Sequence, residues 1–290
     1  MRIPTIWYKH SEKIETDNYE VIDNVWQKNG TELRTYNFLG GSLSSLDEAK
    51  KNALKKRDVI RNKIEGKEDY RNPQEYDIDI CEEIIATIDE KNVITRNRYG
   101  ALVLNAEHLM IVDVDHNKAR YRIPDFNIFR YLVSFFKQKK YSEGLLGHLE
   151  EALDKKAYHH LYTRIYQTPN GYRLILQGQK FNARSQESKK LMRRLYADWE
   201  YSNICYQQQC YRARLTPKPW RIKIKRPKII FPFRTDEENL KHNAWVEQYQ
   251  TKSEGYSACR LIREIGEKRK NKVVDYHDEF CKALSNLPMA

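Results

Sequence analysis

The chain has 290 residues, and its 52 lysine and arginine residues outnumber 40 aspartate and glutamate residues, which gives a formal charge of +12. No stretch approaches the roughly 20 apolar residues that a membrane-spanning helix needs, and the first residues carry no secretory-signal pattern. The five cysteines lack the paired short spacings of a disulfide framework or a structural zinc site. We therefore expect a soluble, cytoplasmic protein with reduced thiols, in one large or two small domains.

Residues 1–92 are expected to form an N-terminal region of strands and helices. Short apolar clusters within residues 1–40 indicate a few strands. Ser45-Leu-Asp-Glu48 is a capping box, and apolar residues follow it at helical spacing as far as Ile64, with Gly66 placed to end the helix. A second, shorter helix is predicted over residues 78–88.

Residues 93–234 are expected to form an α+β core. Three segments rich in branched and apolar residues predict adjacent strands, at residues 93–95, 100–104 and 109–115. Two further segments alternate like strands around a turn at residues 168–171, which predicts a hairpin of residues 161–167 and 172–177. Helices are predicted over residues 127–139, 143–156 and 186–203, and residues 211–214 suit a last strand. This order predicts one sheet with helices on one face.

Residues 235–290 are expected to form a helical C-terminal extension. Thr235-Asp-Glu-Glu238 is a second capping box, which predicts a helix as far as about Tyr249. Two more helices are predicted, over residues 256–268 and 274–287. No glycine- or serine-rich linker separates the extension from the core.

Two aspartates project together from one predicted strand. In Leu109-Met-Ile-Val-Asp113-Val-Asp115, side chains alternate between the two faces, so Asp113 and Asp115 point to the same side while Val112 and Val114 are expected to be buried on the other. Paired carboxylates at the end of an apolar strand suit a hard divalent cation such as Mg²⁺ or Mn²⁺. The alternative is that the strand ends here and both aspartates are solvated.

The predicted hairpin turn carries groups that suit an anion. The backbone amides of Thr168, Asn170 and Gly171, together with the Thr168 hydroxyl, can face a phosphate, and Arg173 follows as a fork-shaped donor. The alternative is an ordinary surface hairpin with a charged edge residue.

A second set of cations follows on the predicted strand at residues 211–214. Arg212 and Arg214 share one face of that strand, and Lys218 follows a proline turn, so the three can clamp a triphosphate or a nucleic-acid strand. The alternative is a basic edge strand that discourages aggregation.

No acidic residue occurs between Glu200 and Asp236, and aromatic residues are interleaved with the basic ones in this span. That composition is typical of surfaces that bind nucleic acid. The candidate nucleic-acid-binding residues are Arg221, Lys223, Lys225, Arg226 and Lys228.

The order of these motifs over roughly residues 93–225 resembles the archaeo-eukaryotic primase superfamily, the primase-polymerases. The resemblance implies an RRM-like sheet core in which Asp113 and Asp115 form the first metal-binding motif. It also implies a second motif at residues 168–173, where Arg173 replaces the family's histidine, and a third metal-binding aspartate, for which Asp198 is the candidate. The activity so implied is a nucleotidyl transferase that uses Mg²⁺ or Mn²⁺, nucleoside triphosphates and DNA or RNA.

Other interpretations remain open at this point. The missing histidine favours a catalytically inactive, primase-like binding subunit of a larger bacterial complex, and segments of the chain are similar to uncharacterised bacterial proteins. A metal-dependent nuclease would use the same aspartates, whereas a DxD glycosyltransferase agrees less well with the basic stretch. The histidines, His277-Asp278 among them, show no spacing that indicates a metal site.

Overall fold

The computed structural model describes residues 1–66, 78–116 and 144–290. The chain divides into two compact units, one of Arg2–Cys81 and one of Glu82–Ala290 together with Met1. It belongs to the α+β class, and all ladders between the described strands are antiparallel. The helix expected over residues 127–139 lies outside the described residues.

In its described residues, the unit of Arg2–Cys81 consists of a long hairpin and one helix. Strands β1 (Ile6–Ile22) and β2 (Val25–Ser42) pair along their length and are joined by Asp23 and Asn24, both at positive φ. Two consecutive residues at positive φ match the right-handed twist of a hairpin, and Asp and Asn tolerate that conformation. The strands expected in residues 1–40 are therefore confirmed.

Helix α1 (Leu46–Ile64) begins as its capping box predicts, since the Ser45 hydroxyl accepts a hydrogen bond from the Glu48 amide at 3.2 Å. The helix lies against the hairpin at Gly40, where an added Cβ would stand 2.0 Å from the backbone oxygen of Ala49. Glycine at this position and the fully buried alanines opposite it allow the two backbones to approach closely.

The larger unit contains two four-stranded sheets, ordered β10-β7-β8-β6 and β3-β4-β5-β9. The first consists of β6 (Met110–Asp115), β7 (Tyr162–Thr168), β8 (Gly171–Gln177) and β10 (Arg260–Ile265). The second consists of β3 (Glu83–Asp89), β4 (Asn92–Arg96), β5 (Leu102–Ala106) and β9 (Tyr211–Arg214). The predicted core strands and the β7–β8 hairpin are thus confirmed, but they belong to two sheets instead of one.

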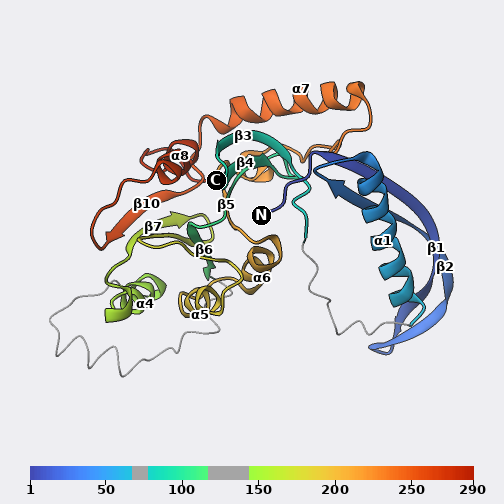
Figure 1. Ribbon diagram of the computed structural model, residues 1–290, viewed down its shortest axis with the longest axis horizontal. Helices are drawn as coiled ribbons and strands as arrows, with labels where there is room; N and C mark the ends of the chain where they lie inside the picture. The colour runs from blue at the N-terminus through green and yellow to red at the C-terminus, as the bar shows by residue number, and fades with distance from the viewer. Residues whose placement is uncertain (67–77, 117–143) are drawn as a thin grey trace. The chain divides into compact units, whose positions relative to one another are not determined.

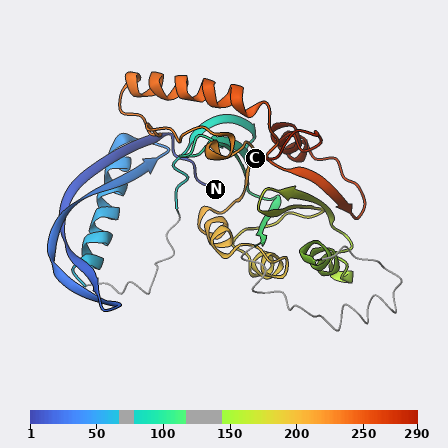
Figure 2. The ribbon, with the colours of Figure 1, turned by 180° about the vertical axis from the view of Figure 1, so that it is seen from behind.

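The helices in the described residues of this unit are α4 (Gly144–Leu153), α5 (Gln186–Arg194), α6 (Trp199–Gln208), α7 (Asp236–Ser253) and α8 (Lys272–Cys281), with short 3₁₀ turns at Lys156–Tyr158 and Pro219–Ile222. Figures 1 and 2 both show α4, α5 and α6 on one side of strands β6 and β7 and α8 on the other. Contacts agree, because Tyr166 of β7 and Arg173 of β8 both reach side chains of α8. The expectation that helices cover only one face is therefore wrong.

Strand β6 lies next to both sheets. It pairs with β8 and not with β5, its neighbour in the chain. On its other side, the Tyr201 hydroxyl of α6 contacts two backbone oxygens, that of Ile111 in β6 at 2.8 Å and that of Arg212 in β9 at 3.0 Å. Val112 and Val114 are buried, as the alternation of β6 predicts. The Tyr201 side chain therefore links β6 to β9 across the boundary between the sheets.

Three predicted helices differ in the structure. Residues 78–88 contain strand β3, an edge strand paired with β4, and residues 256–268 contain strand β10, paired with β7. The helix expected over residues 186–203 is two helices, because Tyr196 takes a positive φ and Asp198 caps a new helix.

The described boundaries also differ from the expected regions 1–92, 93–234 and 235–290. The first boundary lies between Cys81 and Glu82, because β3 pairs with β4. The C-terminal extension contains β10, which joins the central sheet, as well as helices α7 and α8. Helix α7 begins as its capping box predicts, with the Thr235 hydroxyl accepting from the Glu238 amide.

Candidate functional site

A pocket of about 180 Å³ lies where β6, β8, β9 and the start of α6 meet. Its lining contains most of the residues that the sequence indicates for metal or phosphate chemistry, although they come from separate segments of the chain. The lining residues are Asp113, Val114, Asp115, Thr168, Asn170, Tyr172, Arg173, Asp198, Tyr201, Arg214, Lys218 and Arg221. Acidic side chains come from β6 and α6, and basic ones come from β8, β9 and the turn after β9.

The acidic part of the pocket consists of three aspartates. Asp113 and Asp115 are separated by one residue on β6 and therefore share a face, as predicted. Asp198 is the N-cap of α6, where one carboxylate oxygen accepts from the amides of Glu200 at 2.8 Å and Tyr201 at 3.2 Å. Its own amide donates to the Asp113 backbone oxygen at 3.0 Å. The helix cap thus fixes the third aspartate beside the strand that carries the other two.

Arg173 lies directly opposite Asp113 in the β6–β8 ladder and is only 2% exposed. Its Nε donates to the Asp113 carboxylate at 2.9 Å, and its Nη1 donates to the Arg214 backbone oxygen at 2.8 Å. Burial lowers the pKa of Arg173, but the Asp113 carboxylate and the sulfur groups of Cys259 and Cys281 together outweigh burial, and the pKa lies above its ordinary value. Arg173 is therefore a permanent cation whose donors are used mainly within the protein.

The basic part of the pocket consists of Arg214, Lys218 and Arg221. Burial lowers the pKa of Arg214 to about 10, and repulsion from nearby arginines adds to that effect. Burial also lowers the pKa of Lys218, and repulsion from Arg214 and Arg221 lowers it further. The Nε of Arg214 is buried without a hydrogen-bond partner among the described residues. A bound anion would relieve this repulsion and supply the missing acceptor.

Several predicted binding residues lie outside the pocket. Arg212 forms an ion pair with Glu82 and donates to Gln208 at 3.0 Å. Gly171 is needed for packing, because a Cβ there would lie 1.9 Å from the Val114 backbone oxygen. Its predicted role as a phosphate-binding backbone has no place in the pocket lining.

The predicted nucleic-acid-binding residues beyond Arg221 are exposed, namely Lys223, Lys225, Arg226 and Lys228. The Arg226 guanidinium lies 4.7 Å from the ring centre of Tyr99 and 4.5 Å from that of Trp220. This stacking orders one of the four side chains, while the three lysines have no partner within the described part of the chain and can face a polyanion.

Sequence reasoning missed two features. Tyr201 lines the pocket and links β6 to β9, and burial raises its pKa, so its hydroxyl stays protonated. Cys259, His277 and Cys281 form a buried cluster, although no metal site was expected there from the sequence. The spacing of His277 and Cys281, four residues apart on one helix, was the available signal.

Searches of family models, curated proteins and solved structures find no match to the chain. Among the described residues, the helices are too short or too polar to span a bilayer.

Proposed function

We propose that the pocket binds a nucleoside triphosphate together with divalent metal ions, and that the protein is a nucleic-acid-binding nucleotidyl transferase of primase-polymerase type. One observation carries the proposal: three aspartates and four cations from separate segments line the same pocket. Carboxylates bind the metal ions and cations hold phosphates in enzymes that transfer nucleotides. Neither half alone would distinguish this chemistry from simple anion or cation binding.

The donor set fits Mg²⁺ or Mn²⁺, since Asp113, Asp115 and Asp198 offer hard carboxylate oxygens. Such an ion would activate a 3′-hydroxyl and neutralise the departing pyrophosphate. Arg214, Lys218 and Arg221 would hold the triphosphate, whose negative charge offsets their mutual repulsion. Arg173 would hold the Asp113 carboxylate in position through the hydrogen bond from its Nε.

The order of elements around the pocket supports the same proposal. The described elements from β6 to β9 are a strand, a helix, two strands, two helices and a strand, which is the β-α-β-β-α-β order of a split βαβ fold. Because Tyr201 links β9 to β6, the strands can be followed as β9-β6-β8-β7. An RRM-like core has four such strands in one sheet, whereas here β9 pairs with β5 in the second sheet and contacts β6 through the Tyr201 hydroxyl.

Conservative variants test the proposal. Asp115→Asn removes one carboxylate, and Asp198→Asn does so while keeping a side chain that caps a helix equally well. We expect each to lower template-directed incorporation of labelled nucleotides with Mn²⁺ by roughly 100-fold or more, with binding to nucleic acid largely retained. The double variant Asp113→Ala/Asp115→Ala should abolish incorporation.

The matched control is Asp236→Asn, an exposed aspartate on α7, which should leave incorporation unchanged. Wild-type incorporation rates in Asp115→Asn and Asp198→Asn would refute the assignment of these aspartates.

A second candidate function is a catalytically inactive subunit that binds nucleic acid or nucleotides within a larger complex. The observation that favours it is the ion pair between Asp113 and Arg173, which neutralises a metal-binding carboxylate at the position where the family has a histidine. No extension of primed or unprimed templates, together with salt-sensitive binding, would support this candidate. Shortening of the template would instead indicate a metal-dependent nuclease.

A further inference from the structure

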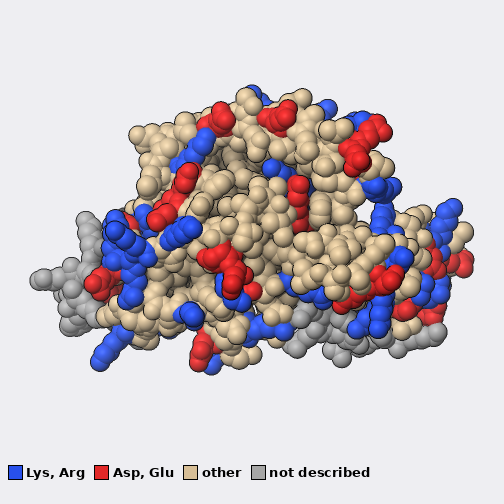
Figure 3. Space-filling model, turned by 45° about the horizontal axis from the view of Figure 1, so that its top comes forward, with Lys and Arg blue, Asp and Glu red and all other residues tan. Residues whose placement is uncertain are grey.

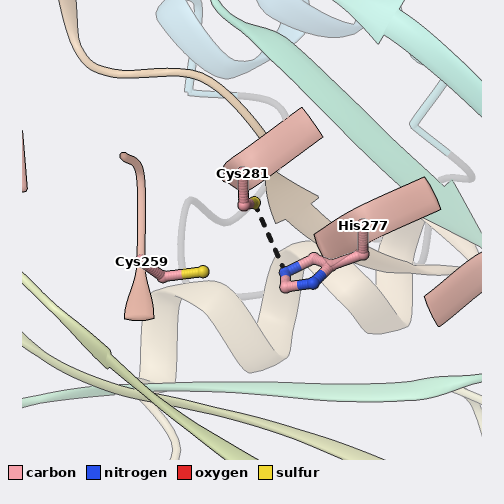
Figure 4. Close-up of side chains that lie close together, drawn as sticks. All are labelled: Cys259, His277 and Cys281. Atoms are coloured by element: carbon pink, nitrogen blue, oxygen red, sulfur yellow. Dashed lines mark hydrogen bonds between the residues drawn. The ribbon is translucent and has the colours of Figure 1, made fainter. Parts of the chain in front are cut away.

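Three side chains that can bind a transition metal lie close together (Figure 4), and one of them, His277, is 3.3 Å from the guanidinium of Arg173. Cys259 immediately precedes β10, and His277 and Cys281 lie one turn apart on α8. All three are fully buried, and their ligand atoms lie within 4.8 Å of one another. Thiol and imidazole groups are the ligands that zinc prefers, in contrast to the carboxylates of the pocket.

The separation of two ligand atoms in this cluster matches the geometry around a tetrahedral ion. Zinc binds sulfur at about 2.3 Å and nitrogen at about 2.0–2.1 Å, so tetrahedral geometry places the two ligand atoms about 3.6 Å apart. In the structure, Cys281 Sγ and His277 Nε2 are 3.6 Å apart. Two tetrahedral thiolates would stand about 3.8 Å apart, so Cys259 Sγ, already within 4.8 Å of both other ligand atoms, needs only a small shift.

The surroundings of His277 also suit a metal ligand. Its Nδ1 lies 2.9 Å from Asp278 Oδ1, and the same oxygen accepts from the Tyr166 hydroxyl at 2.6 Å. Arg164 forms an ion pair with the other carboxylate oxygen. A carboxylate held in this way fixes the ring so that Nδ1 carries the proton and the Nε2 lone pair is directed at the sulfurs. This is the carboxylate–histidine arrangement found behind metal-bound imidazoles.

The positive charge of the Arg173 guanidinium disfavours any net positive charge on the neighbouring cluster. Its Nη1 lies 3.3 Å from His277 Nε2 and 4.0 Å from Cys281 Sγ. Two thiolates balance the charge of one Zn²⁺, so a loaded cluster adds no net positive charge beside the guanidinium. Nη1 would then leave His277 Nε2 to the ion and keep its 2.8 Å hydrogen bond to the Arg214 oxygen.

We propose that Cys259, His277 and Cys281 bind one Zn²⁺, with the fourth tetrahedral position taken by a water molecule. The ion would hold α8 against the residue that precedes β10. It would also keep the Arg173 guanidinium in its position beside the cluster. This site is independent of the proposed nucleotidyl transfer, because its ligands, its metal and its test differ from those of the pocket.

The test is a direct measurement of metal. The full chain is purified without a polyhistidine tag or chelator, and its zinc content is measured by plasma mass spectrometry. We expect one zinc per chain, and we expect cobalt substitution to give thiolate-to-cobalt charge-transfer absorption. Cys259→Ser and Cys281→Ser should each lose the zinc and the cobalt spectrum. Cys210→Ser, at a buried cysteine outside the cluster, should keep both.

The wild-type chain alone can overturn the proposal, so unstable variants do not weaken the test. Folded wild-type protein that holds no metal after refolding with excess Zn²⁺ would contradict it. So would a thiol titration in denaturant, without reductant, that finds three free thiols in place of the five cysteines, since that result would indicate a disulfide within the cluster.

Discussion

At the residue scale, the two aspartates of β6 have different partners and therefore different energetic roles. Asp113 balances the charge of Arg173, which is almost completely buried, whereas the Asp113 side chain itself is 38% exposed. Removing one member of a buried ion pair is costly mainly when the remaining charge is cut off from water. Loss of Asp113 should therefore cost more stability than loss of Asp115, which faces Gly171 and not a buried cation in the same ladder.

We predict that Asp113→Asn lowers the free energy of unfolding by about 3 kcal/mol, because the Arg173 cation is left without a counter-charge in a buried position. Asp115→Asn should change it by no more than about 1 kcal/mol. Urea denaturation of both variants, followed by circular dichroism, measures the difference. If both variants lose the same free energy of unfolding, the buried Arg173 cation is not stabilised by Asp113.

The cations of the pocket support a prediction of opposite sign. Lys218 is held beside Arg214 and Arg221, and burial and repulsion lower its pKa. We predict that Lys218→Met raises the melting temperature of the free protein and weakens triphosphate binding by about tenfold or more, as expected for a lost hydrogen bond to a charged group. Calorimetry and titration with a fluorescent nucleoside triphosphate measure the two effects. Lys55→Met, on the exposed face of α1, is the control and should change neither.

At the scale of secondary-structure elements, the position of β9 relative to β6 decides whether the basic and acidic halves of the pocket meet. The Tyr201 hydroxyl makes the contacts that link these strands. We predict that Tyr201→Phe costs about 1–2 kcal/mol of stability, because buried carbonyl groups lose a donor. Triphosphate affinity should fall as well, although Phe cannot remove any charge. If the Tyr201→Phe variant is destabilised but its affinity for triphosphate is unchanged, the contacts that link β9 to β6 do not determine binding in the pocket.

The β6–β8 ladder gives a second prediction at this scale. Gly171 faces Asp115, and an alanine Cβ would stand 1.9 Å from the Val114 backbone oxygen. Backbone cannot move aside as a flexible side chain can, so Gly171→Ala should lower the melting temperature markedly. Gly255→Ala is the matched control, since its Cβ would meet a single neighbour at 3.9 Å. Equal melting temperatures for the two variants would contradict the tight approach of β8 to β6.

Secondary-structure elements were predicted correctly from the sequence where the contacts that determine them are local. The capping boxes at Ser45 and Thr235 predicted the starts of α1 and α7 correctly, because a cap and its partner amide lie within one turn. The alternation in β6 likewise predicted which valines are buried. Strand β10 was mistaken for helix because its state depends on pairing with β7, far away in the chain.

The same rule applies to the candidate site. Asp113, Asp115, Arg214 and Lys218 were chosen from local patterns, and the structure brings them into one pocket. Arg212 was chosen from the same strand pattern, but Glu82, a residue 130 positions away, takes its guanidinium. The Cys259 cluster was missed for the same reason, since its three residues meet only when β10 and α8 pack together.

At the scale of the whole molecule, the charge of +12 is distributed over many positions of the chain. On the face drawn in Figure 3, lysine and arginine side chains are interspersed with aspartate and glutamate side chains. On that face, specific positions must therefore account for any polyanion binding. The exposed lysines after the pocket, Lys223, Lys225 and Lys228, are the best placed, because they follow directly on the cations that line it.

We predict that the triple variant Lys223→Gln/Lys225→Gln/Lys228→Gln weakens nucleic-acid binding and makes its salt dependence shallower. Each phosphate contact contributes about 0.7–0.9 to the slope of log K against log salt, so losing three contacts should reduce the slope by about 2 to 3. Binding of a free nucleoside triphosphate should stay unchanged, because these lysines lie outside the pocket lining. A control with the same change in net charge replaces three exposed lysines elsewhere, Lys51, Lys55 and Lys252. If both triple variants lose the same slope, net charge alone drives binding and residues 223–228 form no specific path for nucleic acid.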